Sequence, residues 1–416
     1  SGQNIPFAVN HPARIRHSGD KAKLVSANDQ SGFTFRGRFS DSEECCTVGY
    51  DVTQKAHSAL RWLIGRQSAF RNDTQVIVAW AVRNANLQKL VANTDEILGD
   101  VFIDSSLEPE SFENAEDIGQ EYALKLKKKI SGYRAELKDR DDIVVMALDS
   151  ATPGRMAVTY YREIKGSEFL ERIENYHIRY AWRQFFGKDH QFIGAPAIDQ
   201  IAKIAYAGKT SPELMKSTVS RLLPSVMDGA PIPPDLLLSV CRRAASPLSV
   251  EPWEHSKLMG IACGLYSGAH IERGYQMSLE ENRCMRDYLF GRLLAVADYL
   301  EDSALRVAGE SRDTTAMKLM QKFSERPYST WSTIEGNLSS YMSRLKTRRP
   351  KKLKYLRDLL DDIHAKFPDG EYENDKKLSP EFLLGYHCQR HELYKKTEEA
   401  ELKGETQETP ESKENN

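Results

Sequence analysis

The sequence has few cysteines and no long apolar run, and both shortages limit where it can work. Its six cysteines are scattered, and no two of them form a CxxC pair. This argues against a disulfide scaffold and a cysteine-rich zinc site, and it favours the reducing cytoplasm. Every apolar run is far shorter than the roughly 20 residues that cross a membrane. We therefore expect a cytoplasmic protein without a membrane partner.

An excess of charge of one sign is also absent. The 416 residues include 58 Lys and Arg against 60 Asp and Glu, for a formal net charge of −2. This balance excludes a uniformly basic nucleic-acid coat but permits local basic patches. Residues 397–416 hold seven Glu and two Lys, so this end carries −5 and the rest of the chain +3. We expect the glutamate-rich end, residues 397–416, to be disordered.

The short motifs of several enzyme classes are missing too. There is no Walker or dinucleotide-binding glycine loop and no GxSxG motif. One weaker pattern places Asp142 and Asp149 around a predicted strand, with Glu163 and Lys165 closing the next strand. In a metal-dependent nuclease, two carboxylates hold a divalent ion and a lysine orients water. Charged strand ends explain the pattern more simply, so we expect no catalytic residues and no cofactor, with a nuclease as a remote alternative.

A second weak pattern concerns zinc. His387, Cys388 and His391 fall on one predicted helix, where residues four apart share a face and could hold the ion. A structural zinc site needs four ligands, and no nearby residue is an obvious fourth one. We therefore expect a packed or exposed helix end and no metal site.

The N-terminal part contains clear strand patterns. Alternating or continuous apolar residues predict strands at 32–39, 76–82, 143–148 and 156–161. The turn sequence Ala151–Gly154 joins the last two, which predicts an antiparallel hairpin. Thr53 is expected to cap a helix. The highly charged stretch 95–140 is expected to be helical or a mobile insertion.

Beyond residue 165 the strand signal ends and helical patterns follow. Ser211-Pro212-Glu213 is typical of a helix start, and Ser278 with Glu281 predicts a capping box ahead of a long helix. Ser379-Pro380-Glu381 begins a last helix that runs through Tyr394. The predicted fold class is α+β, with a mixed α/β domain over 1–165, a helical connecting region over 166–276, a helical bundle over 277–396 and the acidic tail.

Two basic clusters are candidates for nucleic-acid contact. In the first, eight of fourteen residues are cationic and none is acidic: Arg344, Lys346, Arg348, Arg349, Lys351, Lys352, Lys354 and Arg357. Phosphate backbones favour such a run, because each contact releases condensed counterions. A solvated connection between helices around Pro350 is the plainer interpretation, but eight unbalanced charges repel one another unless something neutralises them.

The second cluster lies near the N-terminus. It comprises Arg14, Arg16, Lys21, Lys23, Arg36 and Arg38, interleaved with Asn10, His11, Asn28, Phe33 and Phe35. Arginine, asparagine and aromatic side chains together suit contact with a DNA groove or a single strand. A polar strand face and loop would give the same composition.

Several blocks of the sequence resemble one protein family. These blocks are His11–Arg16, Gly19–Leu24, Asn28–Phe39, Gly49–His57, Gly229–Leu237, Ser278–Arg283, Tyr288–Leu294 and Phe382–His387. They run through nearly the whole chain and are similar to the large subunit of the type I-C CRISPR surveillance complex (Cascade). Members usually carry substantial sequence ahead of the block that starts at His11, so the resemblance implies that part of the N-terminal portion is missing here.

The resemblance implies a non-catalytic subunit that binds target DNA next to the PAM, the short motif flanking the target. It also implies that the subunit stabilises the R-loop for a separate helicase-nuclease, while guide pairing reads the sequence. The helical C-terminal part resembles the small subunit, which this family makes from an internal start. Met277 is the candidate start, and Met285 is the second choice.

The implied partners are double-stranded and single-stranded target DNA, crRNA-bound backbone subunits, the small subunit and the helicase-nuclease. The main alternative is an assembly module that binds only protein, either neighbouring subunits or an inhibitor that mimics DNA with acidic side chains. Tight subunit binding without DNA affinity would distinguish that alternative from a DNA-binding subunit.

Overall fold

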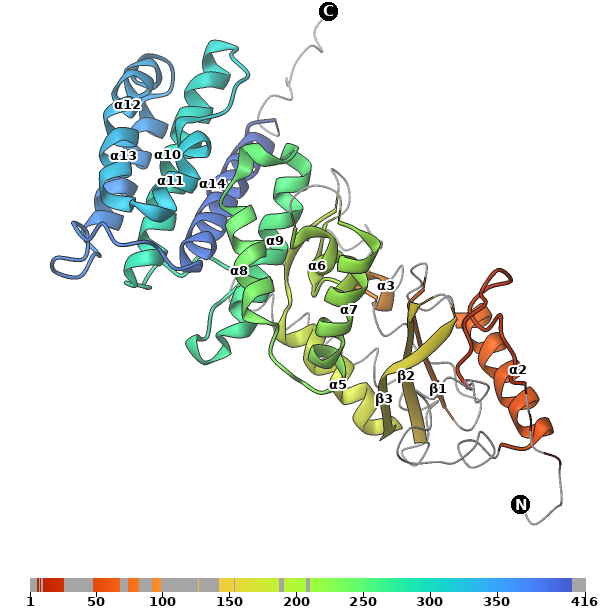
Figure 1. The fold of residues 1–416 in the computed structure, drawn as a ribbon. Helices are drawn as coiled ribbons and strands as arrows, with labels where there is room; N and C mark the ends of the chain where they lie inside the picture. Colours follow the sequence, from red (N-terminus) through yellow and green to blue (C-terminus); the bar gives the residue numbers. More distant parts are fainter. Residues whose placement is uncertain are drawn as a thin grey trace, which may run out of the picture.

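The computed structural model describes most of the chain from residue 48 onward and parts of the segment before it. The described residues are 6, 8, 10–25, 48–67, 74–81, 92–98, 126, 142–152, 154–186, 191–206 and 210–405. Figure 1 shows one sheet and α2 toward the N-terminal end and a set of long helices at the opposite end. The predicted α+β fold class is confirmed.

A three-stranded antiparallel sheet forms the N-terminal end. It consists of β1 (Val76–Ala81), β2 (Asp142–Thr152) and β3 (Arg155–Lys165), in that order. Val78 lies opposite Met146, which in turn lies opposite Tyr161. These strands confirm the three apolar runs and the hairpin, since alternate residues of β1 and β2 enter apolar clusters on opposite faces of the sheet. The expected strand at 32–39 lies outside the described residues.

Helix α2 (Tyr50–Gln67) covers one face of this sheet, and the short α3 (Thr94–Leu98) follows β1. The buried stripe of α2 includes Leu60 and Ile64, which pack against the face of the sheet that α2 covers. Thr53 does not cap this helix, so that prediction is wrong. The Tyr50 N–H already bonds to the Pro6 carbonyl (2.9 Å) and the helix begins there, which leaves Thr53 buried within its first turns.

A second sheet contradicts the expectation that strands end at residue 165. After α5 (Gly166–Arg179), β4 (Trp182–Phe185) pairs with β5 (Gln191–Gly194). Strands of four residues are too short for a readable alternation, and tertiary packing holds this pair in place. A Cβ at Gly260 would lie 2.4 Å from the Arg183 carbonyl oxygen, so this glycine lets the helix carrying it approach β4 closely.

Short helices connect the sheets to the bundle. They are α6 (Ile198–Ile204), α7 (Pro212–Met227), α8 (Pro234–Ala244) and α9 (Pro252–Ala269), with 3₁₀ turns η3 (Pro247–Ser249) and η4 (Ile271–Arg273). The helix start predicted around Ser211 is confirmed, since the Ser211 hydroxyl accepts a hydrogen bond from the Leu214 N–H (3.2 Å). This bond satisfies one of the free amides of the first turn.

The C-terminal bundle is arranged around α10. Its helices are α10 (Arg286–Ala308), α11 (Thr315–Glu325), α12 (Pro327–Arg348), α13 (Pro350–His364) and α14 (Glu381–Glu405). Helix α10 contacts the other four and is buried on nearly all sides between Tyr288 and Leu305. Its contact with α14 depends on two glycines: a Cβ at Gly291 would lie 2.0 Å from the Phe382 carbonyl, and one at Gly385 would lie 2.1 Å from the Tyr288 carbonyl.

Two expectations about this bundle are wrong. Ser278 and Glu281 form no capping box, because they lie in the connection before α10, which begins only at Arg286. Helix α14 extends past Tyr394 to Glu405, so residues 397–405 are helical and not disordered. Glutamate is a good helix former, and α14 is already nucleated by its packing on α10.

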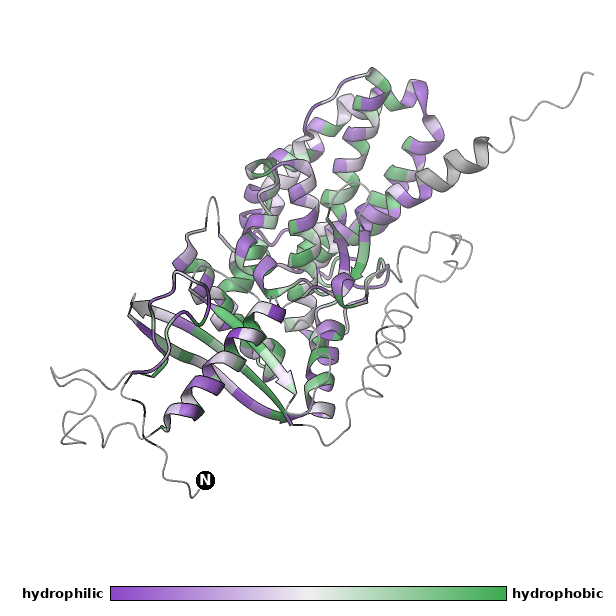
Figure 2. Cartoon of the chain, turned by 90° about the vertical axis from the view of Figure 1, so that its right-hand side faces the viewer, coloured by the Kyte–Doolittle hydropathy of each residue, from purple (hydrophilic) through white to green (hydrophobic). Residues whose placement is uncertain are grey.

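One apolar core runs from the three-stranded sheet to the bundle. It joins Ile77 and Val145 of the sheet through Trp182 and Leu258 to Leu293 of α10. Figure 2 shows apolar and polar residues alternating around most helices, as expected where one side packs and the other faces water. Among the described helices, none has the length and apolarity required to cross a membrane.

Candidate nucleic-acid interface

The first basic cluster forms the connection between α12 and α13, which we call the basic turn (residues 344–357). Arg349 has a non-helical backbone between the two helices, and Pro350 is the first residue of α13. Proline cannot continue α12, but its fixed φ suits the first turn of a new helix. Figure 1 places this turn at the end of the molecule far from the N-terminal sheet.

Helical periodicity directs most of these cations to the solvent. Leu345, Leu353 and Leu356 are buried and anchor both helices to the bundle core. Seven cationic side chains on the turn are exposed: Arg344, Lys346, Arg348, Arg349, Lys351, Lys354 and Arg357. The run of cations is visible in the sequence. The buried leucines explain why these cations are exposed together on one surface.

Arg344 is the least available member of this surface. Its guanidinium pairs with Glu310 at the end of α10 (2.8 Å) and lies 5.7 Å from the ring centroid of Tyr341. Hydrogen bonds from Arg344 and Arg312 lower the pKa of Glu310, so this carboxylate stays ionised. Arg312 lies at the same distance from the Tyr341 ring. Arg344 therefore joins α12 to α10 besides contributing charge.

Lys352 also has a structural contact. It is half-buried, and its Nζ lies 4.3 Å from the ring centroid of Tyr299, a buried residue of α10. This cation–π contact holds α13 against α10. Among the described residues, no carboxylate pairs with the six remaining exposed cations Lys346, Arg348, Arg349, Lys351, Lys354 and Arg357. These six are the open part of the basic turn.

The N-terminal cluster divides into buried and exposed members. Arg14 and Lys21 are exposed, and Lys23 is half-buried. The main chain of Lys23 adds to the edge of β3, since its carbonyl accepts from the Met156 N–H (3.0 Å). Arg36 and Arg38 lie outside the described residues.

Arg16 is not available for phosphate contact. It is 5% exposed, and its Nε and Nη2 each donate to a different oxygen of Asp20, both at 2.8 Å. A third donor, Nη1, binds the Thr74 carbonyl. Burial alone would raise the pKa of Asp20, but the hydrogen bonds from Arg16 and the Ala22 N–H lower it. Arg16 therefore holds the N-terminal segment in place and is no longer a candidate for contact with DNA.

Sequence reasoning missed a basic and aromatic surface on α2. Arg61 donates to the Arg14 carbonyl (3.0 Å) and the Ala13 carbonyl (3.2 Å), which brings the N-terminal segment alongside the helix. The next residue, Trp62, is 55% exposed, and the guanidinium of Arg66 lies 5.0 Å from its ring. The signal for this surface was an aromatic residue and an arginine four positions apart on an amphipathic helix.

The nuclease alternative finds no support in the hairpin geometry. Asp149 lies opposite Ala157, whereas Glu163 lies opposite Val144, near the other end of β3. At about 3.3 Å per residue, the six residues from Ala157 to Glu163 span roughly 20 Å, too far for shared coordination of one ion. Lys165 forms an ion pair with Asp142, and Asp149 accepts a hydrogen bond from the Thr74 hydroxyl (2.6 Å).

The histidines of α14 are likewise engaged in packing. Nε2 of His391 accepts a hydrogen bond from Arg183 of β4 (2.9 Å), and burial lowers the pKa of His391 to about 4. His387 packs against Trp182 and Phe185, and burial lowers its pKa to about 3. Within the described part of the chain, no group of three or more His, Cys, Asp or Glu side chains could hold a metal ion.

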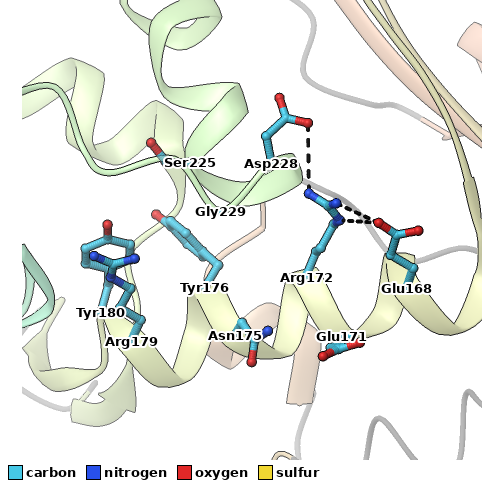
Figure 3. A pocket seen from close by; sticks show the side chains of 10 residues that line it. All are labelled: Glu168, Glu171, Arg172, Asn175, Tyr176, Arg179, Tyr180, Ser225, Asp228 and Gly229. Atoms are coloured by element: carbon cyan, nitrogen blue, oxygen red, sulfur yellow. Dashed lines mark hydrogen bonds and ion pairs between the residues drawn. The ribbon is translucent and has the colours of Figure 1, made fainter. Parts of the chain in front are cut away.

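A polar pocket lies between α5 and the connection from α7 to α8 (Figure 3). Arg172 lies on one side of it, 2.6 Å from Glu168 and 3.9 Å from Asp228. Asp228 also accepts hydrogen bonds from the Tyr160 hydroxyl (3.1 Å) and from Arg162 (3.0 Å). The guanidinium groups of Arg162 and Arg172 thus balance the carboxylates of Glu168 and Asp228.

Comparison with known families identifies a match over most of the chain. The family described as "CRISPR-associated protein (Cas_Csd1)" matches residues 1–394, which include both sheets and most of the helical bundle. No curated protein matches the chain.

Proposed function

This chain belongs to the CRISPR-associated Cas_Csd1 family, and from that premise we propose that it is the non-catalytic large subunit of a type I-C interference complex. In this role it binds target DNA next to the PAM and stabilises the opened strands for a separate helicase-nuclease. Pairing with the crRNA reads the target sequence, while the protein contacts the backbone and the flanking motif. The crRNA-bound backbone subunits would be its neighbours in the complex.

The observation that carries this proposal is the open part of the basic turn. Six exposed cations, for which the described residues supply no carboxylate partner, lie on one connection between two packed helices. Bringing a phosphate backbone to this surface would relieve their mutual repulsion and release condensed counterions. If all six contacted duplex phosphates, they would contribute a slope of roughly −5 to a plot of log affinity against log salt concentration.

The experiment that tests the proposal reverses part of this charge. Replacing Arg348, Arg349 and Lys351 by Glu should weaken DNA binding and make the salt slope less steep by about 3. Binding would be measured by fluorescence anisotropy with labelled duplex and single-stranded DNA across a salt series. Unchanged affinity and slope would reject the assignment of the basic turn.

A matched control changes the same charge elsewhere in the bundle. Lys322, Arg326 and Lys376 are exposed near the opposite end of α12, whose 22 residues span roughly 33 Å. Replacing these three by Glu alters the net charge by the same amount. The control variant should keep a salt slope close to that of the native chain, because these residues lie far from the basic turn.

The proposed small subunit fits the helix boundaries. The connection that contains Met277 precedes α10, and Met285 is the residue directly before it. Starting at either methionine would retain all five bundle helices and the basic turn. We propose Met277 as the internal start. Mass spectrometry of the product from the untagged reading frame would test it, since replacing Met277 by Leu should abolish a fragment that begins there.

A further inference from the structure

We infer that Trp62 on α2 is a stacking surface for an unpaired base of bound nucleic acid. This inference rests on the proposed function, because it assumes that the chain binds DNA. It adds a residue outside both basic clusters and specifies the form of DNA that the residue recognises. The argument depends on the position of the ring, the cations around it and the chemistry of its neighbours on α2.

The Trp62 ring is held at the surface of α2. Leu60 and Ile64 are buried against the sheet, whereas Trp62 is 55% exposed on the other side of the helix. Arg66, one turn further along, places its guanidinium 5.0 Å from the ring centroid. A single guanidinium can cover only one face of an indole ring, so Arg66 by itself leaves the second face to a flat partner.

Further cations lie on and next to this part of α2. Arg61, the residue before Trp62, binds the carbonyls of Ala13 and Arg14, so it fixes the N-terminal segment against α2. Arg14 is exposed, and its φ of 59° is held by the hydrogen bond from its N–H to the Asp20 carbonyl (2.9 Å). This backbone conformation is uncommon outside glycine. Arg66 at the ring and Arg14 on the segment that Arg61 binds thus offer phosphate contacts at this part of α2.

The neighbours of Trp62 favour nucleic acid over an apolar protein partner. Ser58, Ala59 and Gly65 are exposed around it, so within the described helix α2 no second large apolar side chain lies one turn before or after Trp62. Single-strand-binding surfaces combine an aromatic ring with nearby cations, because bases stack on the ring and phosphates meet the charge. Protein interfaces of comparable stability require a larger cluster of anchors.

The partner should contain unpaired nucleotides. Inside a duplex, both faces of each base are covered by the neighbouring base pairs, so a protein ring can stack only on a terminal or unpaired base. Single-stranded and forked DNA expose such bases, whereas blunt duplex offers them only at its ends. We therefore expect Trp62 to contribute to binding of forked DNA and little to binding of blunt duplex.

The test uses the full chain with Trp62→Ala and Trp62→Phe variants. Binding to a forked oligonucleotide and to a blunt duplex is measured by fluorescence anisotropy at low salt. The affinity of Trp62→Ala for the fork should fall about tenfold, within the range known for lost base stacking, while Trp62→Phe keeps most of it. The affinity of both variants for the blunt duplex should stay within about twofold of the native value, since stacking makes little contribution there.

Trp253 provides a matched control. It is 56% exposed in the first turn of α9, so Trp253→Ala removes an equally exposed indole from another part of the molecule. This variant should bind the fork like the native chain. Circular dichroism confirms that each variant is folded. At saturating single-stranded DNA, tryptophan fluorescence should be quenched in Trp253→Phe but much less in Trp62→Phe, and the amplitude at saturation does not depend on affinity.

The outcomes separate this inference from the proposed function. Native affinity of Trp62→Ala for forked DNA overturns the stacking role and leaves the α2 surface to a protein partner. A fall of equal size for fork and blunt duplex overturns the recognition of unpaired bases. If the native chain binds none of these DNAs, the proposed function fails, and the stacking role fails with it.

Discussion

At the scale of single residues, burial decides what a cation can do. Arg16 and Arg14 are two positions apart and identical in chemistry, yet one is enclosed by Asp20 and Thr74 while the other faces solvent. The same contrast separates Lys352, which lies over Tyr299, from the exposed Lys351. A charge run in a sequence is therefore only a set of candidates, from which the tertiary structure selects the free ones.

Replacing Asp20 by Asn should destabilise the N-terminal segment. Both side chains of the Arg16–Asp20 pair are 3% exposed, and breaking a buried pair costs about 3 kcal/mol or more because one charge stays unpaired. Urea unfolding at pH 7 would measure the change in the free energy of unfolding. Asp235→Asn is the control: its pair with Arg221 is largely exposed, so we expect less than about 1 kcal/mol.

The pH dependence of this pair has a definite sign. The folded protein lowers the pKa of Asp20 below its ordinary value of 3.8, so the contribution of Asp20 to stability is present above that value. It is lost as the pH falls through the lower pKa of the folded state. Between pH 5 and pH 2 the native chain should thus lose stability that Asp20→Asn never had. Parallel acid-unfolding curves for the two proteins would contradict this assignment.

At the scale of the elements, glycine determines how closely helices pack. The contact between α10 and α14 depends on Gly291 and Gly385, each of which faces a backbone carbonyl of the other helix. The sequence predicts the apolar periodicity of both helices, but not the short distance between them, because a glycine inside a helix only indicates a low helix propensity. Its role in close packing can be recognised only when the position of the facing helix is known.

Replacing Gly291 by Ala should therefore destabilise the bundle. The new Cβ would lie 2.0 Å from the Phe382 carbonyl oxygen, so the helices must separate, which costs about 1–3 kcal/mol as overpacking. Gly336→Ala provides the comparison. Gly336 lies on the exposed side of α12 with nothing within 4 Å, so alanine there should stabilise the protein by up to about 1 kcal/mol. The midpoint of thermal unfolding would be measured for each variant, and an equal decrease in both midpoints would contradict this account.

At the scale of the whole molecule, charge is distributed unevenly along the chain. Residues 397–416 carry −5 while the rest carries +3, and α14 brings the start of this acidic segment to the same end of the bundle as the basic turn. The Nζ of Lys396, the residue before the segment, lies 5.8 Å from the ring of Tyr355 in α13. Negative charge at the same end of a molecule as a cationic surface reduces the electrostatic potential that a phosphate backbone meets.

Replacing the seven glutamates of residues 397–416 by glutamine should therefore strengthen DNA binding. The net charge would rise from −2 to +5 without a change in chain length. The gain in affinity should be severalfold at low salt and should shrink as salt screens it. Anisotropy with duplex DNA would measure it, and a variant with seven Asp in place of Glu would keep the charge and the native affinity. Equal affinity of the Gln and Asp variants would contradict a role for this charge.

The sequence by itself determined the local elements and the composition of the candidate surfaces. The hairpin of β2 and β3, the start of α7 at Ser211 and the eight cations of the basic turn follow from periodicity, capping and charge, which need only neighbouring residues. The family blocks, spread over nearly the whole chain, are also a property of the sequence alone.

The tertiary structure decided which residues face one another and which face water. It placed β4 and β5 together although four-residue strands carry little local signal, and it enclosed Arg16 beside Asp20. It also exposed Trp62, a residue that hydrophobicity alone would assign to the core. Contacts between distant segments depend on the geometry of the whole chain, and no local pattern contains that information.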